Sequence, residues 1–253
     1  MRTSPKLSVV LPAFNEENSI LEAIDQCRRL VELINSTEVI VIDDGSTDNT
    51  AEVVRRASEE YAWLRLVRHE GNLGYGKAIR TGFAAASGEF VFYTDADNQF
   101  DITELAEHWP LLLDLDMLAG YRVYRYDPFP RLVASWAYNR LVRVLFRVRV
   151  RDVDCSFKVM RRQKLDSIVL LSTDFFIDTE IVARARKWNW RIAEVGVRHF
   201  PRRAGKTTVR PSDVPRTLRV VLRMWFRIHF PNRADHLAAL TVQSGERADR
   251  RGP

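Results

Sequence analysis

The chain has 253 residues, of which 46% are hydrophobic and 28% charged, a composition typical of a globular protein with a substantial core. Its two cysteines, Cys27 and Cys155, exclude a disulfide framework, and no apolar run reaches the roughly 18 residues of a membrane-spanning helix. Residues 1–6 lack the apolar region of a secretory signal, so we expect a cytoplasmic location.

The net charge of +6 is unevenly distributed along the chain. Residues 122–164 contain twelve Lys and Arg against three acidic residues, and residues 198–233 contain ten against one. The remainder carries a net charge of −12. Two basic segments on an acidic body predict anionic partners, such as nucleotide phosphates, a membrane surface or nucleic acid. Since no nucleic-acid-binding motif accompanies the charge, nucleic acid is not an expected partner.

The first half of the chain alternates between apolar strands and helices. Strands are predicted at 7–14, 38–42, 64–68, 89–94 and 117–123, and helices at about 19–33, 51–60 and 72–88. Continuous rather than alternating apolarity in the strands indicates a parallel sheet with both faces covered. Ligands of such sheets bind at the carboxyl ends of the strands. We therefore expect an α/β fold, an open, mostly parallel sheet flanked by helices, with its site at that edge.

Oxygen-bearing side chains follow the fourth predicted strand, at Asp95, Asp97 and Gln99. Alternation along a strand sends all three to the same side. Such ligands suit Mg²⁺ or Mn²⁺, which keeps coordination positions for substrate phosphates. The alternative is an ordinary polar turn after a buried strand. A second carboxylate pair, Asp43 and Asp44, ends another strand, and this convergence favours a nucleotide-binding edge.

The glycines Gly74 and Gly76 lack the spacing of a dinucleotide fingerprint or a P-loop. They instead indicate a tight entry into the third helix.

The second half is basic and amphipathic. Arg140, Arg143 and Arg147 are predicted to share one helical face beside aromatic residues. Further helices are expected from 174 to 187 and from 212 to 230, with a strand at 195–200 between them. On the last helix, Arg216, Arg219, Arg223 and Arg227 form a stripe, and Leu218, Leu222, Trp225 and Ile228 lie largely away from it. Such helices are typical of membrane interfaces, whereas a solvated arginine face over a packed apolar side is the alternative.

Several ordered motifs resemble the family-two inverting glycosyltransferases of GT-A fold, nearest to the dolichyl- or polyprenyl-phosphate mannose synthase-like branch. These motifs are Pro12–Glu16, Asp43–Thr50, Asn72–Ala78, Asp95–Gln99 and Gly120–Arg122, extended by Asp152–Lys158 and the basic loop Arg202–Thr208. The resemblance covers about residues 7–230. We expect a GT-A domain at 1–211, a basic amphipathic helix at 212–233 packed on the domain or the membrane surface, and a flexible tail at 234–253.

The resemblance implies roles for individual residues. The nucleotide would contact Pro12, Phe14, Glu16, Ile42, Asp44 and Ala96, and Arg202 and Lys206 would close on the donor phosphates. The metal, Mg²⁺ or Mn²⁺, would be held by Asp95, Asp97 and Gln99. Asp97, Arg122 and Arg131 would form the catalytic set, with both arginines on the acceptor phosphate. Two departures affect these roles, because Tyr121 stands where relatives often have Ser, and Thr207-Thr208 stand where the loop commonly ends Ser-Lys.

The expected function is metal-dependent, inverting transfer of a hexose, predicted to be mannose from GDP-mannose, to a polyprenyl or dolichyl phosphate. The enzyme would be peripheral to the inner face of the membrane, since the transmembrane helices of some relatives are missing. A phosphate acceptor is already largely dianionic at neutral pH and needs no general base. A hydroxyl acceptor on a glycan or small molecule is the alternative, with Asp178 or Glu180 as its base. A non-catalytic nucleotide- or lipid-binding module is less favoured, because Asp95, Asp97 and Gln99 are all present.

Overall fold

The computed structural model describes residues 6–126, 128–201 and 214–230. The elements in chain order are β1 (Leu7–Ala13), α1 (Ile20–Leu33), β2 (Thr37–Asp43), α2 (Thr50–Glu60), β3 (Leu64–Arg68), α3 (Tyr75–Ala85), β4 (Phe90–Tyr93), η1 (Ile102–Glu104), α4 (Leu105–His108), η2 (Trp109–Asp114), β5 (Met117–Arg122), α5 (Phe129–Phe146), β6 (Lys158–Arg161), α6 (Arg162–Leu165), α7 (Ile177–Lys187), β7 (Ile192–Val197) and α8 (Val214–His229).

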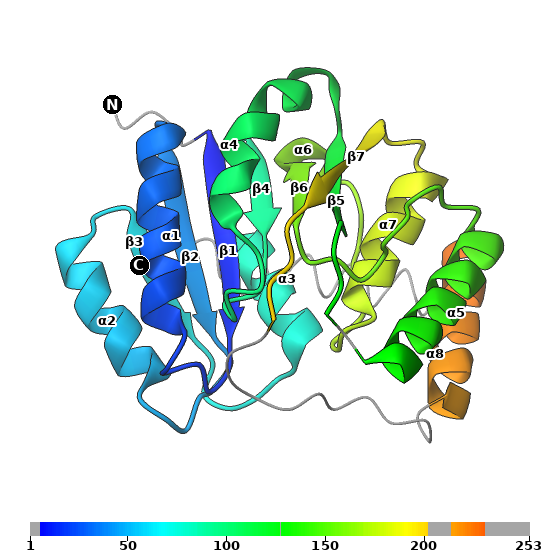
Figure 1. Cartoon of the computed structure of the whole chain (residues 1–253), viewed down its shortest axis with the longest axis horizontal. Coiled ribbons are helices and arrows are strands. Elements are labelled where there is room, and N and C mark those ends of the chain that lie inside the picture. The colour runs from blue at the N-terminus through cyan, green and yellow to red at the C-terminus, as the bar shows by residue number, and fades with distance from the viewer. Residues whose placement is uncertain (1–5, 127, 202–213, 231–253) are drawn as a thin grey trace.

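The strands of the described residues form one seven-stranded sheet in the order β3-β2-β1-β4-β6-β5-β7 (Figure 1). β1 pairs in parallel with β2 and β4, β2 with β3, and β5 with β7. Only β6 runs antiparallel to its neighbours, β4 and β5. The expected open, mostly parallel sheet is thus confirmed.

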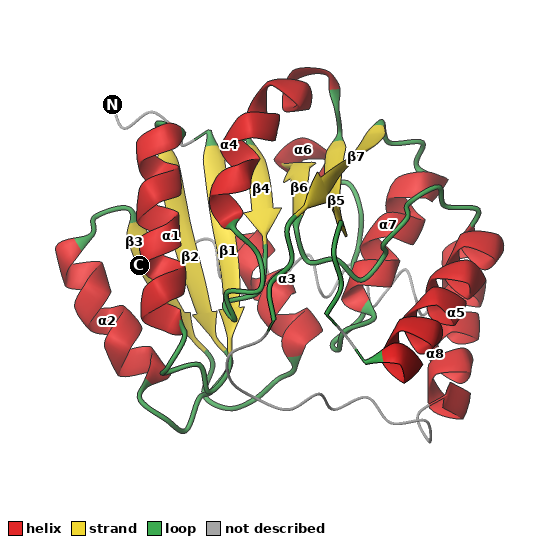
Figure 2. Ribbon diagram, viewed as in Figure 1, coloured by secondary structure: helices red, strands yellow, loops and turns green. Residues whose placement is uncertain are grey.

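Helices cover both faces of the sheet, as Figures 1 and 2 show. Along β2, Ile40 and Ile42 belong to the core cluster that includes buried residues of α3, α5, α7 and α8. Val39 and Val41 point to the other face and pack with buried residues of α1 and α2. Each central strand therefore buries both of its faces, which is why its sequence is continuously apolar.

The segment after β4 differs from the prediction. β4 ends at Tyr93, and the following residues form a turn in which Asn98 has a φ of 57°. Within this turn the backbone N–H of Gln99 donates a hydrogen bond to Oδ1 of Asp97 over 3.1 Å. Alternation along a strand therefore does not extend to Gln99, and that argument for three converging ligands is wrong.

The second half also differs in places. α5 ends at Phe146, and Arg147 takes the left-handed conformation with a φ of 53°, so it leaves the helical face predicted for it. β7 begins at Ile192, three residues before the predicted strand. β6 was not predicted at all, because its four residues begin with Lys158 and end with Arg161.

α8 lies beside α5, and Trp225 Nε1 donates a hydrogen bond to the Leu145 carbonyl over 2.9 Å. Val221, Met224 and Ile228 are buried in the core. Leu218 and Leu222, by contrast, are exposed. Packing of the apolar side of this helix on the domain is therefore only partial. No helix within the described ranges has both the length and the apolarity needed to cross a bilayer.

Candidate active site

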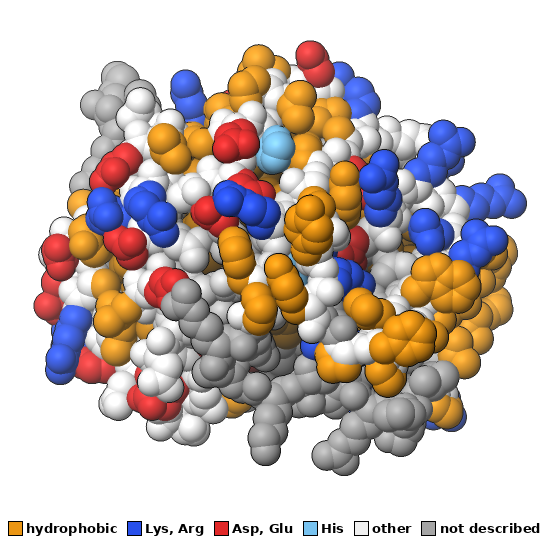
Figure 3. Space-filling model, viewed as in Figure 1, with side chains coloured by type: hydrophobic (Ala, Val, Ile, Leu, Met, Phe, Trp, Pro, Cys, Tyr) orange, Lys and Arg blue, Asp and Glu red, His pale blue; other side chains and the backbone are white. Residues whose placement is uncertain are grey.

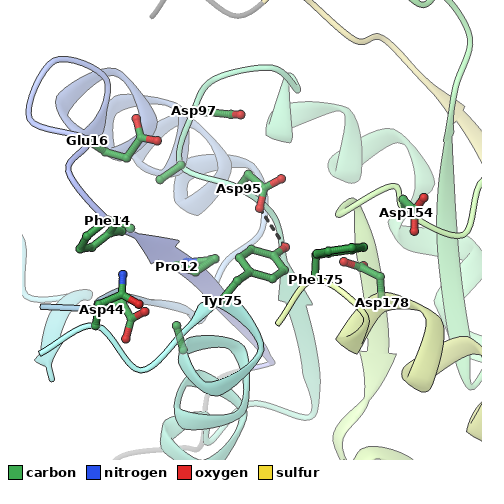
Figure 4. Close-up of a pocket in the computed structure, with 14 residues that line it drawn as sticks. Pro12, Phe14, Glu16, Asp44, Tyr75, Asp95, Asp97, Asp154, Phe175 and Asp178 are labelled. Atoms are coloured by element: carbon green, nitrogen blue, oxygen red, sulfur yellow. Dashed lines mark hydrogen bonds between the residues drawn. The ribbon is translucent and has the colours of Figure 1, made fainter. Parts of the chain in front are cut away.

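A pocket of about 490 Å³ opens where β1, β2 and β4 end. These strands are parallel, so the loops that follow them meet at one edge of the sheet. The pocket is lined by Pro12, Ala13, Phe14, Glu16, Asp44, Asn72, Tyr75, Ala78, Asp95, Ala96, Asp97, Asp154, Phe175 and Asp178 (Figure 4).

Seven of the predicted site residues meet in this pocket, namely Pro12, Phe14, Glu16, Asp44, Asp95, Ala96 and Asp97. Ile42 is fully buried in the core and does not line it. Gln99 also stays outside, since its Nε2 donates to the Phe200 carbonyl over 3.1 Å. Arg202 and Lys206 lie outside the described residues.

Asp95 is held by two hydroxyl groups from different parts of the chain. Tyr75 donates to its Oδ1 over 2.9 Å, and Ser156 Oγ donates to its Oδ2 over 2.8 Å. Burial and then the nearby charge of Asp97 raise the pKa of Asp95 above its usual range. Asp95 is thus oriented by neutral partners, and its negative charge lies close to that of Asp97.

This pair fits a divalent cation, because a hard cation prefers oxygen ligands and would relieve the repulsion between Asp95 and Asp97. Lys and Arg are absent from the described residues that line the pocket, and the two side-chain partners of Asp95 are neutral hydroxyl groups. In the part of the chain that the structure describes, three His, Cys, Asp or Glu side chains do not gather as a metal site. Any further ligands would come from elsewhere, including substrate phosphate oxygens.

Asp44 orders the loop that leads into α3. Its Oδ1 accepts a hydrogen bond from the Leu73 amide, and its Oδ2 accepts one from the Gly74 amide, over 2.9 and 2.8 Å. Nδ1 of His69 lies 2.7 Å from the same Oδ1. Asp44 therefore shapes one wall of the pocket in addition to lining it.

Gly74, directly before α3, and Gly76, in its first turn, allow the second half of the chain to reach the pocket. Gly74 has a φ of 94°, and the Gly76 amide donates to the Thr173 carbonyl over 3.0 Å. A Cβ atom at Gly76 would lie 2.7 Å from the carbonyl oxygens of Ser172 and Asp174. The tight helix entry expected from this glycine pair is confirmed, and it places Phe175 over the pocket.

Asp154 and Asp178 line the pocket on the side of Asp95 that faces away from Asp44 (Figure 4). Asp178 accepts hydrogen bonds from the Tyr93 hydroxyl, over 2.5 Å, and from the fully buried ammonium of Lys158. Asp154 has no such partner, since its inaccessible Oδ1 accepts no hydrogen bond from the described residues. Burial, followed by the charge of Asp178, raises the pKa of Asp154 to about 7.

Glu180, the other suggested base, does not line the pocket. Its Oε2 accepts from the amides of Leu171 and Ser172, and its Oε1 pairs with Arg184. Since both oxygens are engaged in holding α7 and the segment before it, the geometry favours Asp178 over Glu180 for any such role.

The two arginines predicted for the acceptor phosphate lie outside the pocket. Arg122 pairs with Asp152 through two hydrogen bonds, of 2.6 Å from Nε and 2.7 Å from a terminal nitrogen. Its charge is therefore already neutralised in this structure. Arg131 is exposed in the first turn of α5.

Other lining residues were not singled out from the sequence. Asn72, Tyr75 and Ala78 fall inside one recognised motif, and Asp154 falls inside another. Their position inside these motifs was the one feature of the sequence that could have marked them as site residues. No sequence feature marked Phe175 as a site residue, because an aromatic residue before a helix is common.

Comparison with known proteins relates this pocket to sugar transfer. Residues 8–169 match the family described as glycosyl transferase family 2. Similar curated proteins include glycosyltransferase AglD of Haloferax volcanii, 32% identical over 88% of this chain and 37% of its own length. Dodecaprenyl-phosphate galacturonate synthase of Rhizobium johnstonii is 32% identical over 87% of the chain and 65% of its own length. Dolichyl-phosphate beta-glucosyltransferase of Dictyostelium discoideum is 30% identical over 76% and 65%. The chain thus spans less than two thirds of each of these relatives.

Among solved structures, the chain resembles glucosyl-3-phosphoglycerate synthase from Mycobacterium tuberculosis. Its complex with Mn²⁺, UDP and glucosyl-3-phosphoglycerate has a TM-score of 0.68 at 24% identity, covering 90% of this chain and 82% of that one. Its complex with Mg²⁺ and UDP has a TM-score of 0.69 at 24% identity, covering 90% and 81%. This likeness, together with the family match, shows the expected GT-A fold.

Proposed function

Because the chain belongs to glycosyl transferase family 2, we propose that it transfers a hexose from a nucleoside diphosphate sugar to a polyprenyl phosphate. The observation that carries the proposal is the pocket at the carboxyl edge, where Asp95 and Asp97 stand beside Pro12, Phe14 and Asp44. The names of two relatives, a dodecaprenyl-phosphate galacturonate synthase and a dolichyl-phosphate beta-glucosyltransferase, support the class of acceptor.

In this proposal Pro12, Phe14, Glu16, Asp44 and Ala96 bind the nucleotide. Asp95 and Asp97 hold Mg²⁺ or Mn²⁺, with Gln99 as the least supported of the three predicted ligands. A divalent cation there would neutralise charge that develops on the leaving diphosphate. Tyr75 and Ser156 keep the Asp95 carboxylate oriented for it. Arg202 and Lys206, outside the described residues, are proposed to close on the phosphates.

A phosphate acceptor suits this site because it does not require a strong base. The second pKa of a phosphate monoester is about 6, so it attacks as a dianion at neutral pH. Asp178, the carboxylate that the alternative would use on a hydroxyl acceptor, is bound to the Lys158 ammonium and the Tyr93 hydroxyl. Both partners bind Oδ1 of Asp178, so this oxygen is already engaged and is not available to a hydroxyl acceptor. Arg131, exposed on α5, is the better placed of the two predicted acceptor-phosphate ligands.

Membrane attachment is proposed through exposed residues of α5 and α8, which we call the α5–α8 surface. It comprises Phe129, Val133, Trp136 and Val144 on α5, and Leu218, Leu222, Phe226 and Phe230 on and just after α8. Hydrophobic side chains gather over α5 at the right of Figure 3, near Lys and Arg side chains. On α8, Leu218, Leu222 and Phe226 are each followed in the sequence by an arginine, namely Arg219, Arg223 and Arg227. Exposed aromatic and aliphatic residues beside arginines favour insertion at a lipid headgroup boundary.

The sugar is less defined than the reaction. Mannose from GDP-mannose was predicted from the resemblance, but the names of two relatives give glucose and galacturonate. A donor screen therefore tests the proposal. Radiolabelled GDP-mannose, UDP-glucose and UDP-galacturonate are each incubated with polyprenyl phosphate and Mn²⁺, with and without EDTA. We expect lipid-extractable label from at least one donor, lost in EDTA. No label from any donor would contradict the proposal.

A further inference from the structure

The pocket has two ends, separated by Asp95. Figure 4 shows Phe14, Glu16 and Asp44 on one side, and Phe175, Asp178 and Asp154 on the other. On the proposed function, the first end holds the nucleoside and the centre holds the diphosphate. The remaining end is then the place for the sugar, and its chemistry bears on which sugar fits.

This sugar end combines an aromatic wall with carboxylates. Phe175 lines the pocket and is 51% exposed, and its ring packs against that of Phe176, so its remaining exposed surface offers an apolar wall to the C–H face of a pyranose. Asp154 and Asp178 supply acceptor oxygens close to it. A few convergent polar groups beside an aromatic surface are typical of a site that orients a small polar ligand.

The charges around this end are paired with one exception. Asp152 is neutralised by Arg122, and Asp178 by Lys158, whose ammonium also donates to the Cys155 carbonyl. Asp154 alone of these three aspartates has an inaccessible oxygen, Oδ1, with no hydrogen-bond donor among the described residues, and no Lys or Arg lies in a salt bridge with it there. The carboxyl group as a whole is only partly buried and lines the pocket, so its accessible side is left to accept hydrogen bonds from a ligand.

We propose that Asp154 is a specificity-determining residue that binds hydroxyl groups of the transferred sugar and selects a neutral hexose over a hexuronic acid. A sugar hydroxyl donates to the carboxyl group, whereas the carboxylate of a uronate cannot donate and brings a second negative charge. Neither Lys nor Arg among the described lining residues is available to pair with that charge. The inference rests on the proposed function and separates this chain from the relative named a galacturonate synthase.

Binding of matched sugar nucleotides tests this proposal. UDP-glucose and UDP-glucuronate differ only at C6, as do GDP-mannose and GDP-mannuronate, so the pairs cover both bases. Affinities are measured by calorimetry with Mn²⁺, beside UDP and GDP alone. We expect the neutral member of the productive pair to bind at least about tenfold more tightly, because like charges are juxtaposed in the other complex.

Asp154→Asn should bring the two affinities closer, weakening the neutral sugar nucleotide by roughly tenfold while leaving the free nucleoside diphosphate unchanged. Asp25→Asn, an exposed carboxylate on α1, is the matched control and should change none of them. Thermal unfolding of both variants checks that they fold.

Equal or tighter binding of the uronate by the wild type would overturn the proposal. So would a loss of UDP or GDP affinity in Asp154→Asn as large as the loss for the sugar nucleotide, because that would place Asp154 at the nucleotide. Either result leaves the proposed function standing if label still reaches polyprenyl phosphate. Failure of every sugar nucleotide to bind overturns the proposed function and this inference with it.

Discussion

The hydroxyl of Tyr75 donates a hydrogen bond to Oδ1 of Asp95 over 2.9 Å, joining the first residue of α3 to the turn that follows β4. Ser156 holds the other oxygen of the same carboxylate. Neither partner is charged, so both orient the group without neutralising it. The carboxylate is therefore fixed in direction while keeping the charge that a cation requires.

Tyr75→Phe should accordingly weaken metal binding without removing a ligand. Loss of such an outer partner typically costs about 10- to 100-fold in metal affinity, and we expect the low end because Ser156 remains. Mn²⁺ titration followed by electron paramagnetic resonance measures the affinity directly. Tyr61→Phe, at the residue after α2 and away from the pocket, is the control. Unchanged Mn²⁺ affinity in Tyr75→Phe would show that this hydrogen bond does not orient a metal ligand.

Gly76→Ala should destabilise the fold. Alanine normally stabilises a helix by roughly 0.5–1 kcal/mol relative to glycine, but here its Cβ would lie 2.7 Å from two backbone carbonyl oxygens. Steric overlap of this kind costs about 1–3 kcal/mol and should prevail. Gly71→Ala is the control, since its Cβ would meet nothing within 4 Å. Urea unfolding compares the two, and equal stabilities would contradict the close contact between α3 and the Ser172–Asp174 segment.

Asp154→Asn should stabilise the protein in a pH-dependent way. Burial and the charges of Asp178 and Asp152 raise the pKa of Asp154 to about 7, although Arg122 and Lys158 oppose the shift. Between this value and the unfolded value near 3.8, the folded state binds the proton more tightly. The group therefore costs stability as pH rises toward about 7, and the cost is complete above that.

The gain in the Asn variant should be largest near pH 8 and small near pH 4. Its upper limit is a few kcal/mol, since each pKa unit corresponds to about 1.4 kcal/mol. Thermal unfolding at about pH 4, 6 and 8 measures it. A constant difference between variant and wild type across this range would show that Asp154 does not titrate with a raised pKa.

The sequence predicted the parallel half of the fold well because each central strand buries both faces and is continuously apolar. It did not predict β6, where Lys158 is fully buried only because Asp178 and the Cys155 carbonyl surround its ammonium. That compensation joins residues on separate elements, so no local pattern reports it. The failure at Gln99 has a different cause, because β4 already ends at Tyr93 and the residues after it form a turn in which Asn98 is left-handed.

The nucleotide end of the pocket was accessible to sequence reasoning for a related reason. Parallel strands bring their carboxyl ends together, so polar residues after β1, β2 and β4 had to be neighbours. The sugar end depends instead on the close contact at Gly76 and on the position of α7. Asp154 was visible only as part of a motif, and its missing hydrogen-bond partner became apparent only in three dimensions.

The α5–α8 surface should bind anionic membranes by two separable contributions. Replacing Arg219, Arg223 and Arg227 with Gln removes about 1 kcal/mol of attraction per charge, and with it much of the salt sensitivity. Replacing Leu222 and Phe226 with Ser removes the apolar contribution, which persists in high salt. Cosedimentation with vesicles of anionic lipid, at low and high NaCl, distinguishes the two.

The control for this surface is a triple Gln variant at Arg28, Arg55 and Arg56, which are exposed on α1 and α2. It should cosediment like the wild type. Both surface variants should retain transfer to a short, water-soluble prenyl phosphate. If they lose transfer to soluble and membrane-embedded acceptors alike, these residues support the fold or the active site and the docking proposal is wrong.

Sugar transfer to a lipid phosphate can be measured with two acceptors that differ in one group. Polyprenyl phosphate and the matching polyprenol are incubated with the active sugar nucleotide and Mn²⁺, using wild type and Asp97→Ala. We expect lipid-extractable label on the polyprenyl phosphate only, and only with the wild-type enzyme. Label on the polyprenol, or undiminished transfer by Asp97→Ala, would contradict it.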